Sequence, residues 1–135
     1  MKKPNLFIVG TPKAGTTAMY YFLEQHPQIK VSKIKEPNYF IGLFDGDKEK
    51  YLSLFKTKNK KIKYFCEASA RYSTSKEAAK KIYKFNPNAK IIISIREPFS
   101  WYISQIAQTN YLKNKKKYKK NFNINSAKLF YKQRL

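Results

Sequence analysis

The feature that most limits how this chain can fold is a short apolar run that leads into a loop bounded by two glycines. Phe7-Ile8-Val9 precedes Gly10, Gly15 follows after four residues, and the segment from Thr16 onward has the apolar spacing of a helix. Backbone N–H groups at the start of a helix lack intrahelical partners, and the helix dipole places positive charge there. The pattern therefore predicts a strand, a phosphate-binding loop and a helix, in that order.

The side chains of this loop suit an anion. Lys13 carries a full positive charge, and Thr16 and Thr17 offer hydroxyl donors at the start of the helix. A nucleotide-triphosphate loop has the same glycine spacing but needs Lys directly after the second glycine, where Thr16 stands, so a small-molecule kinase of that type is disfavoured. A lysine inside the loop would instead reach the far side of a bound phosphate. A plain glycine-containing turn capped by threonine is the alternative interpretation.

Two elements together resemble the sulfotransferases that use 3′-phosphoadenylyl sulfate (PAPS). The run Pro12-Lys13-Ala14-Gly15-Thr16-Thr17 resembles their 5′-phosphosulfate loop, P-K-S/A-G-T-T. Arg96-Glu97-Pro98, with Ser104 eight residues after Arg96, resembles their 3′-phosphate element. An arginine fork and a hydroxyl at a strand end and on the following helix can converge on one phosphate. The resemblance implies that PAPS, and the product 3′-phosphoadenosine 5′-phosphate (PAP), bind to Pro12, Lys13, Ala14, Gly15, Thr16, Thr17, Arg96 and Ser104.

A third element implies a catalytic base. Lys35-Glu36-Pro37-Asn38-Tyr39-Phe40 resembles the K-E-x-H/N-x-F segment of carbohydrate sulfotransferases, especially the heparan-sulfate type, whose Glu is the proposed base. Glu36 would take the proton of the acceptor hydroxyl or amine, and Lys13 would stabilise charge on the bridging oxygen of the leaving nucleotide. An exposed Glu36 that pairs with Lys33 or Lys35 is the alternative.

A fourth segment, from Glu67 to Tyr72, corresponds to the family's E-K-S/T-P-x-Y. It departs from the animal heparan enzymes because Ala68 stands where they have Lys, which is similar to bacterial-type members. The resemblance implies that Glu67, Ser69 and Arg71 could line an acceptor groove, and packing or capping would explain them almost as well.

The remaining patterns predict alternating strands and helices. We expect strands at 6–9, 28–33, 62–66 and 90–95 and helices at 16–25, 48–56, 75–85 and from 98 onward. The helix at 16–25 is expected to face inward with Met19, Phe22 and Leu23. The helix at 75–85 is expected to face inward with Ala78, Ala79, Ile82 and Tyr83. The predicted fold is α/β, a three-layer parallel β-sheet flanked by helices, and the resemblance makes it similar to P-loop NTPases.

Length and charge set wider limits. A chain of 135 residues is one domain at most. We expect a PAPS-binding core at 1–112 and a basic loop with a marginal terminal helix at 113–135. The net charge of +21 favours anionic partners in general, although a bias toward lysine codons would produce it too, and no nucleic-acid fold signature accompanies it.

Further expectations concern cofactors and location. A single Cys66 and a single His26 predict no metal site and no internal disulfide. The sequence starts close to the first strand without a long apolar run, so we expect no membrane segment and a cytoplasmic location. The predicted function is sulfuryl transfer from PAPS to a carbohydrate-like acceptor, and the alternative is a non-catalytic domain that binds nucleotides or polyanions.

Overall fold

The computed structural model describes residues 2–118, and the chain divides into two compact units at the junction of Glu97 and Pro98. The first unit holds the strands β1 (Leu6–Gly10), β2 (Ile29–Val31), β3 (Tyr64–Ala68) and β4 (Lys90–Ile93). Its helices are α1 (Thr16–Glu24), α2 (Lys48–Ser53) and α3 (Lys76–Phe85), with the 3-10 turns η1 (Tyr39–Ile41) and η2 (Ala70–Thr74). Helix α4 (Pro98–Tyr118) belongs to the second unit.

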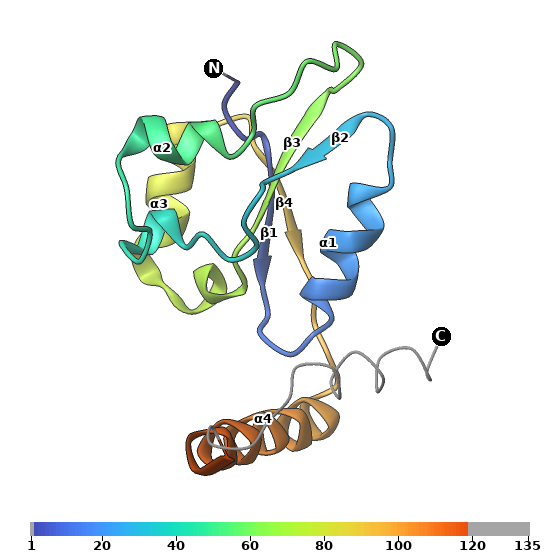
Figure 1. Ribbon diagram of the computed structural model, residues 1–135, viewed down its shortest axis with the longest axis vertical. Helices are drawn as coiled ribbons and strands as arrows, with labels where there is room; N and C mark the ends of the chain where they lie inside the picture. Colours follow the sequence, from blue (N-terminus) through green and yellow to red (C-terminus); the bar gives the residue numbers. More distant parts are fainter. Residues whose placement is uncertain (1, 119–135) are drawn as a thin grey trace. The chain divides into compact units, whose positions relative to one another are not determined.

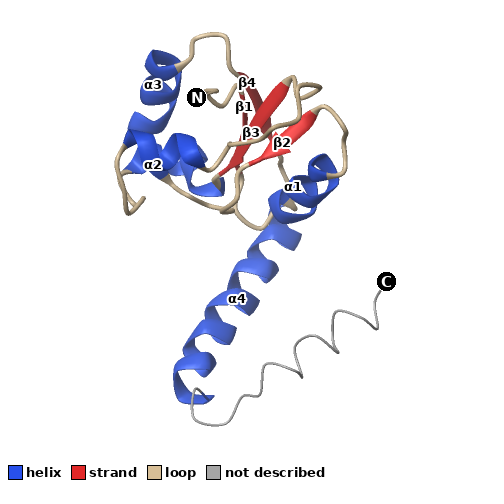
Figure 2. Cartoon of the chain, turned by 45° about the horizontal axis from the view of Figure 1, so that its top comes forward, coloured by secondary structure: helices blue, strands red, loops and turns tan. Residues whose placement is uncertain are grey.

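The strands form one parallel sheet in the order β2-β3-β1-β4 (Figure 1). Leu6 of β1 pairs with Cys66 of β3 on one side and with Lys90 of β4 on the other, so β1 is a central strand. Parallel neighbours require crossover connections, and these carry α1, α2 and α3 to the two faces of the sheet (Figure 2). This confirms the predicted α/β class. Residues that follow β1, β3 and β4 therefore meet at one edge of the sheet.

Strand β1 is buried on both faces, which explains its unbroken apolar run. Phe7 is fully buried in a cluster with Tyr51 of α2, whereas the next residue, Ile8, is fully buried in a second cluster with Tyr20 of α1. Burial of each such side chain contributes about 1.5–3 kcal/mol. The alternation along β1 thus joins the helices of both faces to one strand.

Helix α1 buries a different residue from those predicted. Tyr20 is the buried apolar side chain of this helix, and its hydroxyl donates to the carbonyl oxygen of Ser32 at 2.6 Å. Met19 and Leu23 pack partly against the same cluster. Phe22 is 71% exposed, so its predicted inward position is wrong. The hydrogen bond to Ser32 turns the helix so that Tyr20 faces the sheet and Phe22 faces solvent.

Helix α3 begins where the sequence predicted, but fewer of its side chains are buried than expected. The Ser75 hydroxyl accepts the N–H of Ala78 at 3.3 Å and caps the first turn. Ala78 and Ile82 are buried as expected, but Ala79 and Tyr83 are exposed. The reason is that an apolar groove runs between α3 and β4, and both of these side chains line it instead of the core.

Several element ends also differ from the expectation. Helix α2 stops at Ser53 and not at Lys56, and β4 ends at Ile93, with Ile95 83% exposed. Helix α4 continues through residues 113–118, where a basic loop was expected, because lysine is a good helix former. The predicted boundary after residue 112 falls inside this helix, and residues 119–135 lie outside the described part. No helix among the described residues is long and apolar enough to cross a membrane.

Candidate functional site

The loop between β1 and α1 has the backbone of an anion cradle. Lys13 and Gly15 both have left-handed conformations, with φ of 66° and 83°. Gly15 is the N-cap of α1, and no side chain caps the first turn through a hydrogen bond. This excludes the simple threonine-capped turn, and it leaves the N–H groups at the start of the helix for another acceptor.

The end of β4 closes against this loop. The backbone N–H of Thr11 donates to the carbonyl of Ser94 at 2.6 Å, and the N–H of Ser94 donates to the carbonyl of Gly10 at 2.7 Å. The Ser94 hydroxyl donates to the carbonyl of Ala14. These bonds extend the pairing of β1 with β4 beyond the strands themselves, so the residues after β4 lie beside the loop.

Arg96 is therefore brought to the loop, as the two sequence elements predicted. Its Nη1 donates to the carbonyl oxygen of Lys13 at 3.3 Å, although the two residues are 83 positions apart. The guanidinium is exposed, and this bond uses one of its five N–H donors. A fixed arginine and the N-terminus of a helix thus stand at the same edge of the sheet.

The other predicted phosphate ligands differ in exposure. Pro12 and Ala14 are half-buried within the loop, and Thr17 is exposed at the first turn of α1. Thr16 is only 5% exposed, so its side chain contributes to packing at the helix start. Ser104 lies on α4, in the second unit.

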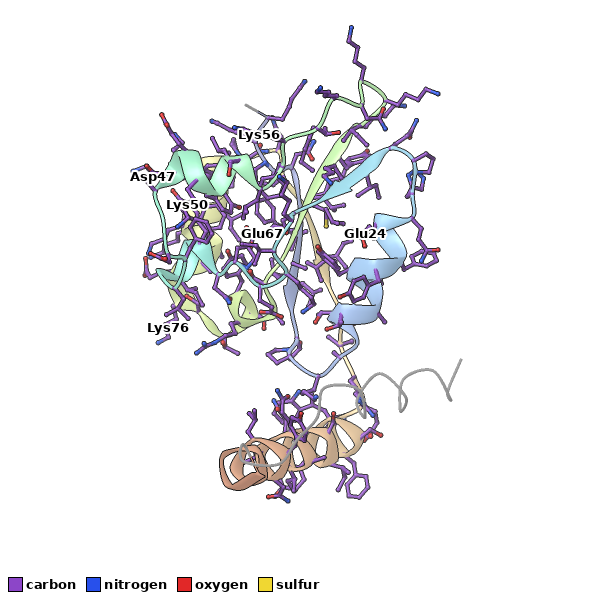
Figure 3. All side chains as sticks on the ribbon, viewed as in Figure 1. Glu24, Asp47, Lys50, Lys56, Glu67 and Lys76 are labelled. Atoms are coloured by element: carbon purple, nitrogen blue, oxygen red, sulfur yellow. The ribbon has the colours of Figure 1, made fainter. Side chains whose placement is uncertain are left out.

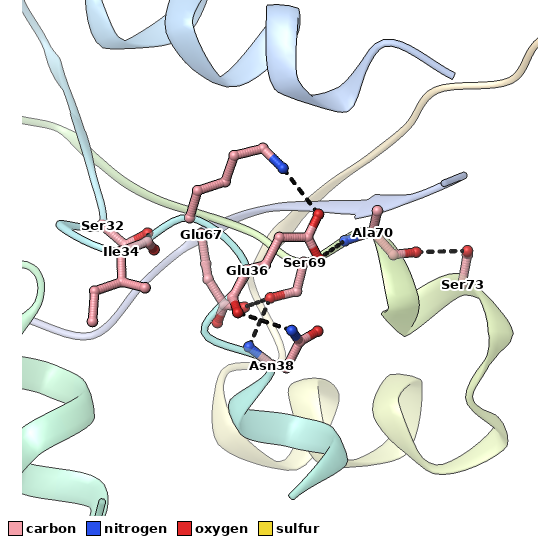
Figure 4. A network of polar contacts seen from close by, with 9 residues as sticks. Ser32, Ile34, Glu36, Asn38, Glu67, Ser69, Ala70 and Ser73 are labelled. Atoms are coloured by element: carbon pink, nitrogen blue, oxygen red, sulfur yellow. Dashed lines mark hydrogen bonds and ion pairs between the residues drawn. The ribbon is translucent and has the colours of Figure 1, made fainter. Parts of the chain in front are cut away.

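Glu36 stands on a loop that follows β2 and is tied to the end of β3. Its backbone is left-handed, with φ of 59°. The Glu36 N–H donates to the carbonyl of Ala68 at 2.9 Å. Its Oε2 accepts the N–H of Ala70 at 3.2 Å (Figure 4). Its Oε1 forms an ion pair with Lys35 Nζ at 2.9 Å, and the side chain is 32% exposed. The ion pair foreseen as the alternative is present, and the carboxylate still reaches solvent.

Beneath this loop lies a buried carboxylate that the sequence interpretation placed elsewhere. Glu67 and Ser69 are fully buried, so neither lines a groove, and only Arg71 of the three suggested groove residues is exposed. Figure 3 shows Glu67 in the interior of the first unit, whereas Asp47 and Lys76 point outward. Glu67 faces α2 because it alternates with Cys66 along β3.

Three hydroxyls surround the Glu67 carboxylate. Tyr51 donates to Oε2, Ser69 donates to Oε1 at 2.7 Å, and the Tyr72 side chain also interacts with the carboxylate. Burial raises the pKa of Glu67, and the nearby charge of Glu36 raises it further. The hydroxyl groups lower this pKa, but the effect of burial is larger. Burial, followed by the Glu67 charge, likewise raises the pKa of Tyr51 and of Tyr72, so both remain neutral hydroxyls.

Asn38 completes the loop and was not singled out as a site residue. Its backbone is left-handed, its Nδ2 donates to the carbonyl of Glu36 at 2.8 Å, and its N–H donates to the Ser69 hydroxyl at 3.0 Å. Its Oδ1 is buried without a hydrogen-bond partner among the described residues. The signal in the sequence was the asparagine itself, because this residue adopts left-handed backbone more easily than most.

These features define a class of protein: an α/β protein with a glycine-bounded loop and an uncapped helix start after its first strand, and an arginine at the end of a neighbouring strand. The chain belongs to the sulfotransferase family, since the profile of the sulfotransferase domain matches residues 3–135. The structure is similar to a sulfotransferase from Alicyclobacillus acidocaldarius, with a TM-score of 0.74 and 27% identity, over 84% of this chain and 52% of that one.

Curated relatives agree with the family. A bifunctional heparan sulfate N-deacetylase/N-sulfotransferase 4 of Mus musculus is 36% identical over 114 residues, which cover 76% of this chain and 13% of the relative. A heparan sulfate glucosamine 3-O-sulfotransferase 6 of Homo sapiens is 33% identical over 107 residues, which cover 78% of this chain and 30% of the relative. The chain therefore spans less than a third of the length of either protein.

Proposed function

We propose that this chain binds PAPS and transfers its sulfuryl group to a hydroxyl or amine of a carbohydrate acceptor. The contact between Arg96 Nη1 and the Lys13 carbonyl supports this most directly, because it joins the two sequence elements that the resemblance assigns to the two phosphate ends of one nucleotide. The residues fit such a ligand. The uncapped start of α1 offers N–H donors, and no described atom lies within 4 Å of a Cβ built on Gly15, so the backbone is open to an approaching anion.

Each residue then has a distinct role. The backbone of Pro12 to Thr17, with Lys13, would hold the 5′-phosphosulfate, and Arg96 would hold the 3′-phosphate, to which the resemblance also assigns Ser104. When bound, PAPS supplies the sulfuryl group and leaves as PAP. Lys13 stabilises the negative charge that develops on the departing phosphate oxygen. Glu36 accepts the proton that the acceptor oxygen or nitrogen loses as its bond to sulfur forms.

The relatives' names suggest the acceptor class. Two of them act on heparan sulfate glucosamine or combine N-deacetylation with N-sulfation, so a glucosamine-containing polysaccharide is the first acceptor to test. Independence from metal ions and a cytoplasmic location stay predictions. Assays in EDTA test the first, and cell fractionation tests the second.

Calorimetric titration with PAP, compared with ATP and magnesium, tests the nucleotide site. PAP should bind in EDTA, and Arg96→Ala should weaken it about 10- to 100-fold, as expected for loss of a hydrogen bond to a charged group. Lys80→Ala is the matched control, since it removes one exposed positive charge from α3. Equal weakening in both variants would show that general charge and not the Arg96 site holds PAP.

Turnover of labelled PAPS with de-N-sulfated heparin tests the chemistry. Glu36→Gln keeps an oxygen for the Ala70 N–H but cannot take a proton, so kcat should fall about 100-fold or more while PAP affinity is unchanged. The exposed Glu24→Gln is the control. PAP binding without any transfer by the unaltered protein would favour the non-catalytic binding domain.

A further inference from the structure

The loop that carries Glu36 is fastened by two hydroxyls. The N–H of Asn38 donates to the Ser69 hydroxyl at 3.0 Å, and the N–H of Phe40 donates to the Tyr72 hydroxyl at 3.2 Å. Both hydroxyls come from the segment that follows β3, about thirty residues further along the chain. Without them, two partly or fully buried N–H groups next to Glu36 would lack acceptors.

Each hydroxyl can accept these bonds only while its own proton points elsewhere. An N–H can only donate, so the Ser69 and Tyr72 oxygens must be the acceptors and their hydrogens must find another partner. For Ser69 that partner is Glu67 Oε1, at 2.7 Å, and the Tyr72 side chain also interacts with the Glu67 carboxylate. A buried Asp or Glu is rare unless its oxygens are satisfied, and here the carboxylate directs the two protons inward so that the lone pairs face the loop.

The same segment also grips Glu36 itself. On one side of Ser69, the carbonyl of Ala68 accepts the N–H of Glu36. On the other side, the N–H of Ala70 donates to the Glu36 carboxylate (Figure 4). Glu36 and Asn38 hold left-handed backbone, which is costly for residues other than glycine and persists only where surrounding contacts maintain it. Loss of the hydroxyl anchors would therefore let the loop relax away from Ala70.

We propose that Ser69 and Tyr72 are positioning residues for sulfuryl transfer: with their hydroxyls oriented by buried Glu67, they hold Glu36 where it can accept the acceptor's proton. This rests on the proposed role of Glu36 as the base. Both side chains are buried beneath the loop, so we expect their effect on the rate of the chemical step and not on the affinity for PAPS.

The test compares three single-hydroxyl deletions in the full chain. Ser69→Ala removes the acceptor of Asn38 N–H, and Tyr72→Phe removes the acceptor of Phe40 N–H. Tyr51→Phe is the matched control, because it deletes a buried hydroxyl on the same carboxylate that anchors neither loop N–H. The first two should lower kcat about tenfold or more with KM for PAPS and Kd for PAP unchanged, whereas Tyr51→Phe should keep kcat within about twofold.

Amide hydrogen exchange gives a second readout that needs no activity. Asn38 should exchange about fivefold faster or more in Ser69→Ala, and Phe40 in Tyr72→Phe, with β1 amides unchanged. Unaltered kcat in both variants, or equal losses in all three, would overturn the inference. If the unaltered protein transfers no sulfuryl group, the proposed function fails, and exchange alone decides: selective acceleration supports the anchors, and equal exchange in all three variants refutes them.

Discussion

The substitution Gly10→Ala should force apart the phosphate loop and the segment that follows β3. Gly10 has φ of 144°, a backbone conformation that residues with a Cβ rarely adopt. An added methyl group would overlap the Ser73 side chain and would come within 2.7 Å of the carbonyl oxygen of Ala70. That carbonyl is part of the backbone and cannot rotate away, so either β1 or the Ala70 segment must shift.

The expected cost is the sum of two effects. Backbone strain at such a conformation costs about 1–3 kcal/mol. Overlap with well-packed atoms costs about 1–3 kcal/mol more, which brings the loss in unfolding free energy to about 2–6 kcal/mol. Gly42 is the matched control, because it has φ of 73° and no described atom lies within 4 Å of a Cβ built on it. Gly42→Ala should therefore cost only about 1–2 kcal/mol of backbone strain.

Urea unfolding followed by circular dichroism measures the difference. Gly10→Ala should unfold at a lower urea concentration than Gly42→Ala, and at equal m-value the difference in unfolding free energy should be about the overlap cost of 1–3 kcal/mol. PAP affinity should fall in Gly10→Ala only, because the loop after β1 moves with it. Equal unfolding midpoints for the two variants would refute the close approach of Gly10 to Ala70.

Two further predictions concern the buried groups. Burial raises the pKa of Glu67, so the folded protein holds its proton more tightly than the unfolded chain. The resulting stability is present below about pH 4.5 and is lost as pH rises through the folded pKa. Urea unfolding at about pH 5 and about pH 8 measures this loss, which should be smaller in Glu67→Gln. An equal loss of unfolding free energy in Glu67→Gln and the unaltered protein would contradict the prediction. Phe7→Ala should cost about 3–5 kcal/mol because Phe7 is fully buried, whereas Phe22→Ala, at a 71% exposed side chain, should change stability by about 0.5 kcal/mol or less. Similar losses in thermal unfolding would mean that Phe22 packs inward after all.

The strands and their parallel pairing could be predicted because the alternation of strand and helix patterns is visible in the sequence. The run at Phe7 is apolar at every position, as required of a strand covered on both faces, and the Ile-rich run at Ile91 reads equally clearly. What the run at Ile91 could not show is its place at the sheet edge, where its side chain is 47% exposed. Position in a sheet depends on pairing with other strands, and a single run carries no information about that.

Helix faces were harder to predict for a related reason. The spacing places Met19, Phe22 and Leu23 on one face of α1. Tyr20 is buried instead, and its hydroxyl donates to the Ser32 carbonyl. A periodicity argument considers only which side chains are apolar, whereas the folded chain must also give the buried Tyr20 hydroxyl a hydrogen-bond partner. Tyr83 is a similar case, since spacing alone cannot reveal the open groove beside α3.

The candidate site shows the same division. The approach of Arg96 to Lys13 could be predicted, because each follows a strand of one parallel sheet and such ends meet at one edge. The burial of Glu67 could not, because a glutamate is ordinarily a surface residue and one of its hydroxyl partners, Tyr51, comes from a distant helix. Its inward position in the alternation of β3 was the one available signal.

The sheet itself relates the two halves of the proposed site. The Ser69 N–H donates to the Ile8 carbonyl at 3.0 Å, which fixes the segment after β3 against β1 just before the phosphate loop begins. Glu36 is bonded to the residues on either side of Ser69, and Gly10 lies against Ala70. Short contacts with the backbone of the segment after β3 thus connect Glu36 to the loop after β1. The register of β1 and β3 therefore sets their spacing, and a change in that register would misplace the proposed base even if every candidate ligand of the nucleotide remained.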